Sequence, residues 1–130
     1  MPQLSDKSKL LLSECDVRLQ GICESAIEIM DFTVITGHRG QAEQDADFAA
    51  GRSKLKWPNG KHNSSPSMAV DIAPYPLDWN DLPRFYLLAG IMQAIAHMRG
   101  IGLRWGGDWN GDFNLKDNKF QDIGHFEIIG

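Results

Sequence analysis

The apolar positions of the chain follow two periods, one typical of helices and one typical of strands. Apolar residues spaced three and four apart predict helices over residues 5–30, 41–50 and 80–99. A break near residues 13–16 would divide the first of these in two. Ser5 and Asn80 are the expected caps of the first and last helices, and Gly51 and Gly100 the expected ends of the second and third. Short runs rich in β-branched and aromatic residues predict strands at residues 32–36, 68–73, 101–105 and 125–129.

The order of the predicted elements is helix, strand, helix, strand, helix, strand, strand. No repeat, low-complexity tract or linker interrupts this order, and 130 residues suit one domain with one core. We therefore expect a single α+β domain over residues 1–130, in which helices pack on a small, mostly antiparallel sheet.

The composition is that of an ordinary soluble globular protein, with 42% apolar and 23% charged residues. The net charge of −4 and the lack of a basic run argue against nucleic acid as a partner. No apolar stretch approaches the ~20 residues of a membrane span, and the first residues lack the apolar core of a secretory signal. We expect a monomer that is made in the cytoplasm and does not insert into a membrane.

Two segments place an imidazole near a carboxylate. His62 precedes Asp71, which interrupts the apolar run of residues 68–73, and a buried carboxylate needs a partner. His125 follows in a strand near the C-terminus. Two histidines and one aspartate are ligands that zinc uses in catalytic sites, with the fourth position left for water. In the alternative interpretation, Asp71 caps a turn before Pro74 and His62 is an ordinary loop residue.

A catalytic zinc site also needs a general base, because zinc lowers the pKa of a bound water toward ~7. Asp122 is the candidate if it lies in the loop that enters the last strand. Glu127 shares a strand face with His125 and is its rival; its milder role would be to support a metal ligand. Arg39, just past the first strand, is either a residue that enters the site or a solvated turn residue.

The same residues carry a family resemblance. The chain resembles the zinc peptidases of the D-Ala-D-Ala carboxypeptidase and hedgehog-type group, which includes phage endolysins that cut the L-Ala–D-Glu bond of peptidoglycan stem peptides. The family pattern Ser-x-His-x-x-Gly-x-Ala-x-Asp corresponds to the segment from His62 to Asp71. Here the spacing is two residues longer, and Gly60 stands in place of the serine.

Three further segments match patterns of the family. They are Thr36-Gly37-His38-Arg39 for the Ser-Gly-Tyr-Arg turn, Asp122-Ile123-Gly124-His125 for the Glu/Asp-x-x-His motif, and Trp105-Gly106-Gly107-Asp108-Trp109, which is similar to the phage subset. The resemblance runs from residue 32 to residue 128 and implies a hedgehog/DD-peptidase-like fold.

The resemblance also implies a role for each site residue. It makes His62, Asp71 and His125 the ligands of Zn²⁺ and Asp122 the general base. It makes Arg39 a residue that binds substrate and steadies the tetrahedral intermediate. It offers Gln44, near Arg39, as a weaker candidate for a further substrate-binding residue. The support of a metal ligand by Glu127 is suggested by its place on the strand and not by the resemblance.

The resulting hypothesis is a zinc metallopeptidase that cleaves peptidoglycan stem peptides, as an L-Ala-D-Glu endopeptidase of a phage or prophage. Such an endolysin would act on the cell wall, in the periplasm, after release through a holin lesion. Two alternatives stay open. One is a D-Ala-D-Ala carboxypeptidase or dipeptidase, and the other is a non-catalytic hedgehog-like zinc-binding module, against which the presence of Asp122 argues.

Overall fold

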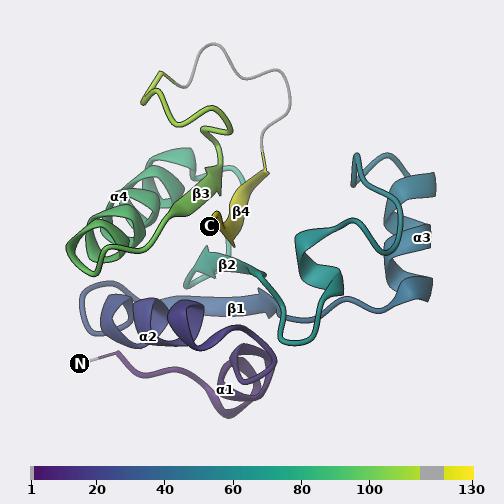
Figure 1. Ribbon diagram of the computed structural model, residues 1–130. Helices are drawn as coiled ribbons and strands as arrows, with labels where there is room; N and C mark the ends of the chain where they lie inside the picture. Colours follow the sequence, from purple (N-terminus) through teal and green to yellow (C-terminus); the bar gives the residue numbers. More distant parts are fainter. Residues whose placement is uncertain (1, 115–121) are drawn as a thin grey trace.

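The computed structural model describes residues 2–114 and 122–130. A four-stranded sheet lies at its centre, with strands in the order β1-β2-β4-β3 (Figure 1). Every neighbouring pair is antiparallel. The bounds are β1 Phe32–Thr36, β2 Ala69–Pro74, β3 Leu103–Gly106 and β4 Asp122–Ile128. The predicted α+β class with an antiparallel sheet is confirmed.

The helices start and stop at the residues that their local chemistry favours. They are α1 Asp6–Leu12, α2 Val17–Ala26, α3 Gln41–Ala49 and α4 Leu82–Met98, with a 3₁₀ turn η1 at Lys61–Asn63. The predicted break between α1 and α2 is present, and Ser5 caps α1 by accepting a hydrogen bond from the Ser8 amide at 3.1 Å. Gly51 and Gly100 follow α3 and α4 with φ of 76° and 68°, a conformation that favours glycine.

Several predicted boundaries are wrong. Asp81, and not Asn80, is the N-cap of α4, because Pro83 lies in the first turn and fixes the helix start beside it. The first helical region ends at residue 26 and not at residue 30. The strand predicted at residues 101–105 spans Leu103–Gly106, and β4 starts at Asp122, well before the predicted residue 125.

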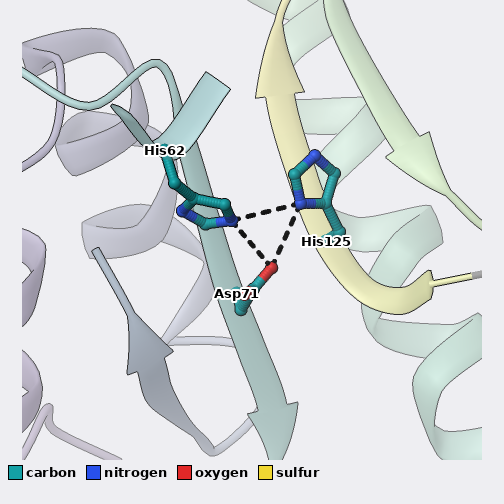
Figure 2. A group of neighbouring side chains, drawn as sticks. All are labelled: His62, Asp71 and His125. Atoms are coloured by element: carbon teal, nitrogen blue, oxygen red, sulfur yellow. Dashed lines mark hydrogen bonds and ion pairs between the residues drawn. The ribbon is translucent and has the colours of Figure 1, made fainter. Parts of the chain in front are cut away.

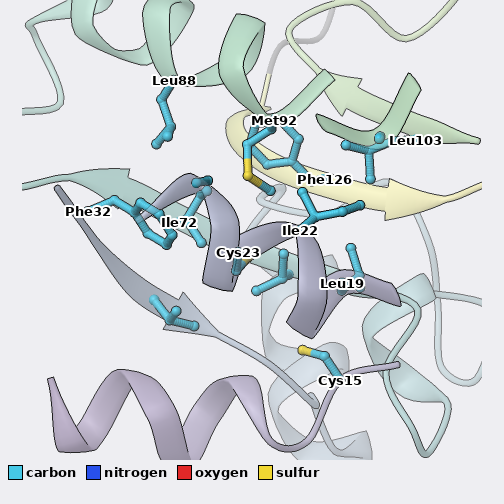
Figure 3. Close-up of a cluster of buried hydrophobic side chains, with 14 of the residues drawn as sticks. Cys15, Leu19, Ile22, Cys23, Phe32, Ile72, Leu88, Met92, Leu103 and Phe126 are labelled. Atoms are coloured by element: carbon cyan, nitrogen blue, oxygen red, sulfur yellow. The ribbon is translucent and has the colours of Figure 1, made fainter. Parts of the chain in front are cut away.

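Side chains alternate along each strand, so one face of the sheet is apolar and the other is polar. One face carries the buried apolar side chains of the core, which pack against α2 and α4 (Figure 3). These are Phe32, Val34, Val70, Ile72, Leu103, Trp105, Phe126 and Ile128. The residues between them point the other way. The second face therefore carries Asp71 on β2, Arg104 on β3, and His125 and Glu127 on β4.

The helices close the core from one side. Both α2 and α4 contribute fully buried side chains to it (Figure 3). They are Leu19, Ile22 and Cys23 of α2 and Leu88 and Met92 of α4. Among the helices of the described residues, none combines the length and apolar character needed to cross a bilayer.

The first prediction concerns this core. Leu19→Ala should lower the free energy of unfolding by about 2–5 kcal/mol, because it opens a cavity at a position that is 0% exposed. Leu10→Ala, at a position of α1 that is 68% exposed, is the matched control and should change it by less than about 0.5 kcal/mol. Chemical denaturation measures both. Equal effects of the two substitutions would contradict the described packing of α2.

Candidate metal centre

Three side chains converge on one point of the polar face of the sheet. Asp71 and His125 lie directly opposite each other in the register of β2 and β4, and His62 reaches them from η1. His62 Nε2, His125 Nδ1 and Asp71 Oδ1 are each 3.2 Å from the other two (Figure 2). Both imidazoles are buried and Asp71 is half-buried. The structure thus brings together the three residues that the sequence predicts as ligands.

Each imidazole has one nitrogen that faces the other two ligands and one outer nitrogen that faces away. The hydrogen bond of the outer nitrogen shows where the proton of the ring lies. His62 Nδ1 lies 2.7 Å from the carbonyl oxygen of Gly37, and His125 Nε2 lies 2.8 Å from Glu127 Oε1. Both partners are acceptors, so the outer nitrogens donate. In the neutral rings the inner nitrogens are then unprotonated and direct lone pairs at the carboxylate of Asp71. Three converging lone pairs repel one another unless a cation or a proton lies between them, and this donor set fits a divalent metal ion.

Without a metal ion, a proton takes that place. Burial alone would raise the pKa of Asp71 and lower the pKa of His125. Their mutual attraction, with the contributions of His62 and Glu127, outweighs burial in both cases. The pKa of Asp71 falls well below its usual range, and the pKa of His125 rises to about 9. A metal ion must therefore displace a proton from His125 at neutral pH.

Close backbone contacts fix the elements that carry the ligands. A Cβ atom on Gly37 would come within 2.2 Å of the Leu11 carbonyl oxygen, so only glycine allows the turn that presents the Gly37 carbonyl to His62. A Cβ atom on Gly124 would lie 2.6 Å from the Ile72 carbonyl oxygen, at the junction of β4 and β2. These two glycines let the strands and the turn approach closely enough to form the centre.

A cleft with a volume of about 520 Å³ opens beside the centre. His62 and His125 line it together with Asp122, Glu127 and Arg39. The sequence interpretation required Asp122 to lie in the loop before the last strand. In the structure it is the first residue of β4. Burial and the negative charge of Asp71 raise the pKa of Asp122, and this effect is only partly offset by the nearby histidines and Arg39. A carboxylate with a raised pKa beside a metal centre is suited to proton transfer.

Glu127 lies behind His125, on the side of the ring away from Asp71. Its Oε1 accepts from His125 Nε2, which is the ring nitrogen that does not face the other ligands. This contact orients the imidazole and fixes its tautomer.

Arg39 is held by three side chains at the edge of the centre. Its Nη2 lies 3.4 Å from Asp71 Oδ2, its Nε lies 3.2 Å from Asp47 Oδ2, and its Nη1 donates to Gln44 Oε1 at 3.2 Å. The guanidinium therefore balances the second oxygen of Asp71, the one that does not face the histidines. It also lines the cleft, where a substrate would meet it.

Gln44 is fully buried, and its amide contacts protein groups. Its Nε2 donates to the Leu55 carbonyl at 2.6 Å and to Ser53 Oγ at 2.9 Å. Its Oε1 accepts from Arg39 and from Asn63 Nδ2. These contacts support Arg39 from behind, and substrate binding by Gln44 stays a prediction.

Three residues of the site escaped the sequence interpretation. Asp47 of α3 anchors Arg39, and Asn63 ties η1 to the Arg39 carbonyl at 3.1 Å. Trp109 lies over His125, with ring centroids 5.4 Å apart. The position of Asn63 beside His62 was a usable signal. Trp109 fell in a recognised motif but received no role, and nothing in the sequence pointed to Asp47.

Comparison of the chain with known proteins assigns the fold and the candidate metal centre to one protein family. Residues 2–129 match the family model described as phage L-alanyl-D-glutamate peptidase. The chain is also 35% identical over 132 residues to the L-alanyl-D-glutamate peptidase of Escherichia phage T5, a match that covers 94% of each protein. It therefore belongs to the phage L-alanyl-D-glutamate peptidase family, and the resemblance predicted from its motifs is confirmed.

A solved structure supports the fold. The L-Ala D-Glu endopeptidase ChiX of Serratia marcescens superposes with a TM-score of 0.79, although only 22% of the residues are identical. The match covers 98% of this chain and 91% of the other.

The second prediction separates support from substrate binding at Gln44. Gln44→Leu should lower the free energy of unfolding by about 1–3 kcal/mol, because it removes the buried amide that accepts from Arg39 and Asn63 and donates to Ser53 and the Leu55 carbonyl. Gln41→Leu, at an exposed position of the same helix, is the control for thermal or chemical unfolding. Unchanged stability of Gln44→Leu together with a raised KM would instead assign the residue to the substrate.

Proposed function

We propose that this chain is a zinc metallopeptidase that hydrolyses the L-alanyl–D-glutamate bond of peptidoglycan stem peptides. The observation that carries the proposal is the convergence of His62 Nε2, His125 Nδ1 and Asp71 Oδ1 within 3.2 Å beside an open cleft. Membership of the phage L-alanyl-D-glutamate peptidase family indicates which peptide bond is cleaved.

The donor set favours zinc over calcium and magnesium. Calcium and magnesium prefer six or more oxygen ligands, whereas two imidazoles and one carboxylate are typical of catalytic zinc. Three protein ligands would leave a fourth position for water or substrate. When bound, zinc supplies Lewis acidity and lowers the pKa of a water molecule to about 7.

The remaining residues would act around that centre. The carboxylate of Asp122 takes the proton from the attacking water and then gives it to the amine nitrogen that leaves the broken C–N bond. The guanidinium of Arg39 stabilises the negative oxygen that develops on the scissile carbonyl. Glu127 keeps His125 in the tautomer that directs Nδ1 inward.

The place of action follows from the substrate. We propose one catalytic domain spanning residues 1–130, acting as a monomer on the cell wall. Release through a holin lesion would bring such an enzyme to the periplasmic side of the wall.

Digestion of purified peptidoglycan tests the function, and this is the third prediction. The zinc-loaded protein should release fragments with a new D-glutamate amino terminus, identified by mass spectrometry and end-group analysis. Products that have lost only the terminal D-alanine would indicate a carboxypeptidase. Intact peptidoglycan in the presence of bound zinc would leave the non-catalytic zinc-binding module as the better interpretation.

The fourth prediction concerns metal binding and pH. Zinc binding at pH 7 should release about one proton, because the pKa of His125 near 9 keeps that ring protonated in the metal-free protein. Affinity should therefore increase with pH up to about 9. Titration calorimetry in buffers of different ionisation enthalpy measures both quantities. His62→Ala and Asp71→Asn should bind far more weakly, whereas His97→Gln, at an exposed position of α4, should bind like the parent.

The fifth prediction assigns the base. Asp122→Asn should keep its zinc and its fold and lose about 10²–10⁴-fold in kcat, because the amide cannot accept the proton. Glu127→Gln is the matched control, since its amide oxygen can still accept from His125, and it should retain much more activity. A nearly normal Asp122→Asn beside an inactive Glu127→Gln would exchange the two roles.

A further inference from the structure

The cleft beside the metal centre is rich in cations, although the chain as a whole carries a net charge of −4. Five cationic side chains line it, namely Arg39, Arg52, Lys54, Lys61 and Arg104. A cleft of this kind attracts an anionic ligand more strongly than the net charge suggests.

Lys54 has an interaction partner of its own, and so do three more of these cations. Arg39 contacts Asp71, Asp47 and Gln44, as described above. Arg52 Nε lies 2.9 Å from Asp47 Oδ1, and Lys61 Nζ donates to the Ile128 carbonyl at 3.3 Å.

Arg104 differs from them. Its Nη1 is 3.8 Å from Glu127 Oε2, which is an ion pair beyond hydrogen-bond distance, and its side chain is 42% exposed. Within residues 2–114 and 122–130, the guanidinium of Arg104 makes no hydrogen bond. Most of its donors are therefore available to a ligand in the cleft.

The position of Arg104 relates it directly to the centre. It lies opposite Glu127 in the register of β3 and β4, on the polar face of the sheet. Glu127 in turn holds His125 at 2.8 Å. One carboxylate thus separates the guanidinium from a ring that faces the candidate metal site, so a ligand at Arg104 lies close to the reacting bond.

The substrate of the proposed function carries a suitable anion at that distance. The nitrogen of its glutamyl residue belongs to the scissile bond, and only one of its two carboxyl groups continues the peptide. The other is free and negatively charged unless it is amidated. A guanidinium can hold such a carboxylate with two parallel hydrogen bonds.

We propose that Arg104 binds the free carboxylate of the glutamyl residue that follows the scissile bond, and that it makes the enzyme selective for the unamidated peptide. The inference rests on the proposed function. Arg104 is a specificity-determining residue in this account, and the bond-breaking step belongs to the metal centre and Asp122.

Two synthetic stem peptides that differ only in this group provide the test, one with the free carboxylate and one with the primary amide. The zinc-loaded parent should show a kcat/KM about 10- to 100-fold higher for the carboxylate, mainly through KM, as expected for hydrogen bonds to a charged group. In Arg104→Gln the ratio of the two kcat/KM values should fall toward one. Arg104→Lys should retain part of the preference, because lysine keeps the charge without the planar fork.

The ratio distinguishes recognition from a purely structural role. Disturbing Glu127 and His125 would slow both peptides equally and leave the ratio unchanged, and an unchanged ratio in Arg104→Gln overturns the proposal. Arg52→Gln is the matched cleft control and should keep the parental ratio. A ratio that falls to one in Arg52→Gln would assign the carboxylate to Arg52 and overturn the proposal. A parent that cleaves both peptides equally refutes the selectivity alone, whereas a parent that cleaves neither refutes the proposed function and this inference with it.

Discussion

Mutual repulsion among three lone pairs is the constraint on which the site depends. Two imidazole nitrogens and one carboxylate oxygen are held 3.2 Å apart in a mostly buried position. Such an arrangement is costly without a positive charge at its centre. The Gly37 carbonyl and Glu127 sustain it from outside by accepting the outer N–H groups, and Arg39 balances the second oxygen of Asp71. The outer contacts thus prepare the site for a cation.

The sheet provides the rigid support for this arrangement. Alternation places apolar side chains on the face covered by α2 and α4 and leaves the opposite face for polar groups. The antiparallel register then sets Asp71 opposite His125 and Glu127 opposite Arg104. Ligands mounted on paired strands keep their separation more accurately than ligands on loops. The same pairing that stabilises the core therefore determines the geometry of the centre and of the adjacent cleft.

Part of the fold and of the candidate site could be predicted from the residues of single segments. The strand at residues 32–36 followed from its composition, and the partnered, half-buried carboxylate of Asp71 followed from the cost of an unpaired charge. The longer spacing between His62 and Asp71 does not disturb the centre, because the Met68 amide donates to the Lys61 carbonyl at 2.9 Å and closes the extra residues into a loop.

Other features depend on contacts between distant segments, and no local pattern reveals them. Gln44 lies near Arg39 in the sequence, but its contact with Asn63 of η1 joins segments that are 19 residues apart. The cationic cleft gathers residues from several elements, so the net charge gave no sign of it. The start of α4 was misplaced because Asn80 is a good capping residue, while Pro83 sets the first turn.

A crystal structure of the zinc-loaded protein, with anomalous diffraction measured at the zinc edge, tests the central claim most directly. The account predicts one strong peak, bonded to His62 Nε2 and His125 Nδ1 at about 2.0–2.1 Å and to an Asp71 oxygen at about 2.0–2.2 Å. It also predicts that the outer ring nitrogens keep their bonds to the Gly37 carbonyl and Glu127. A peak on other residues, or on the outer nitrogens of the two histidines, would contradict it.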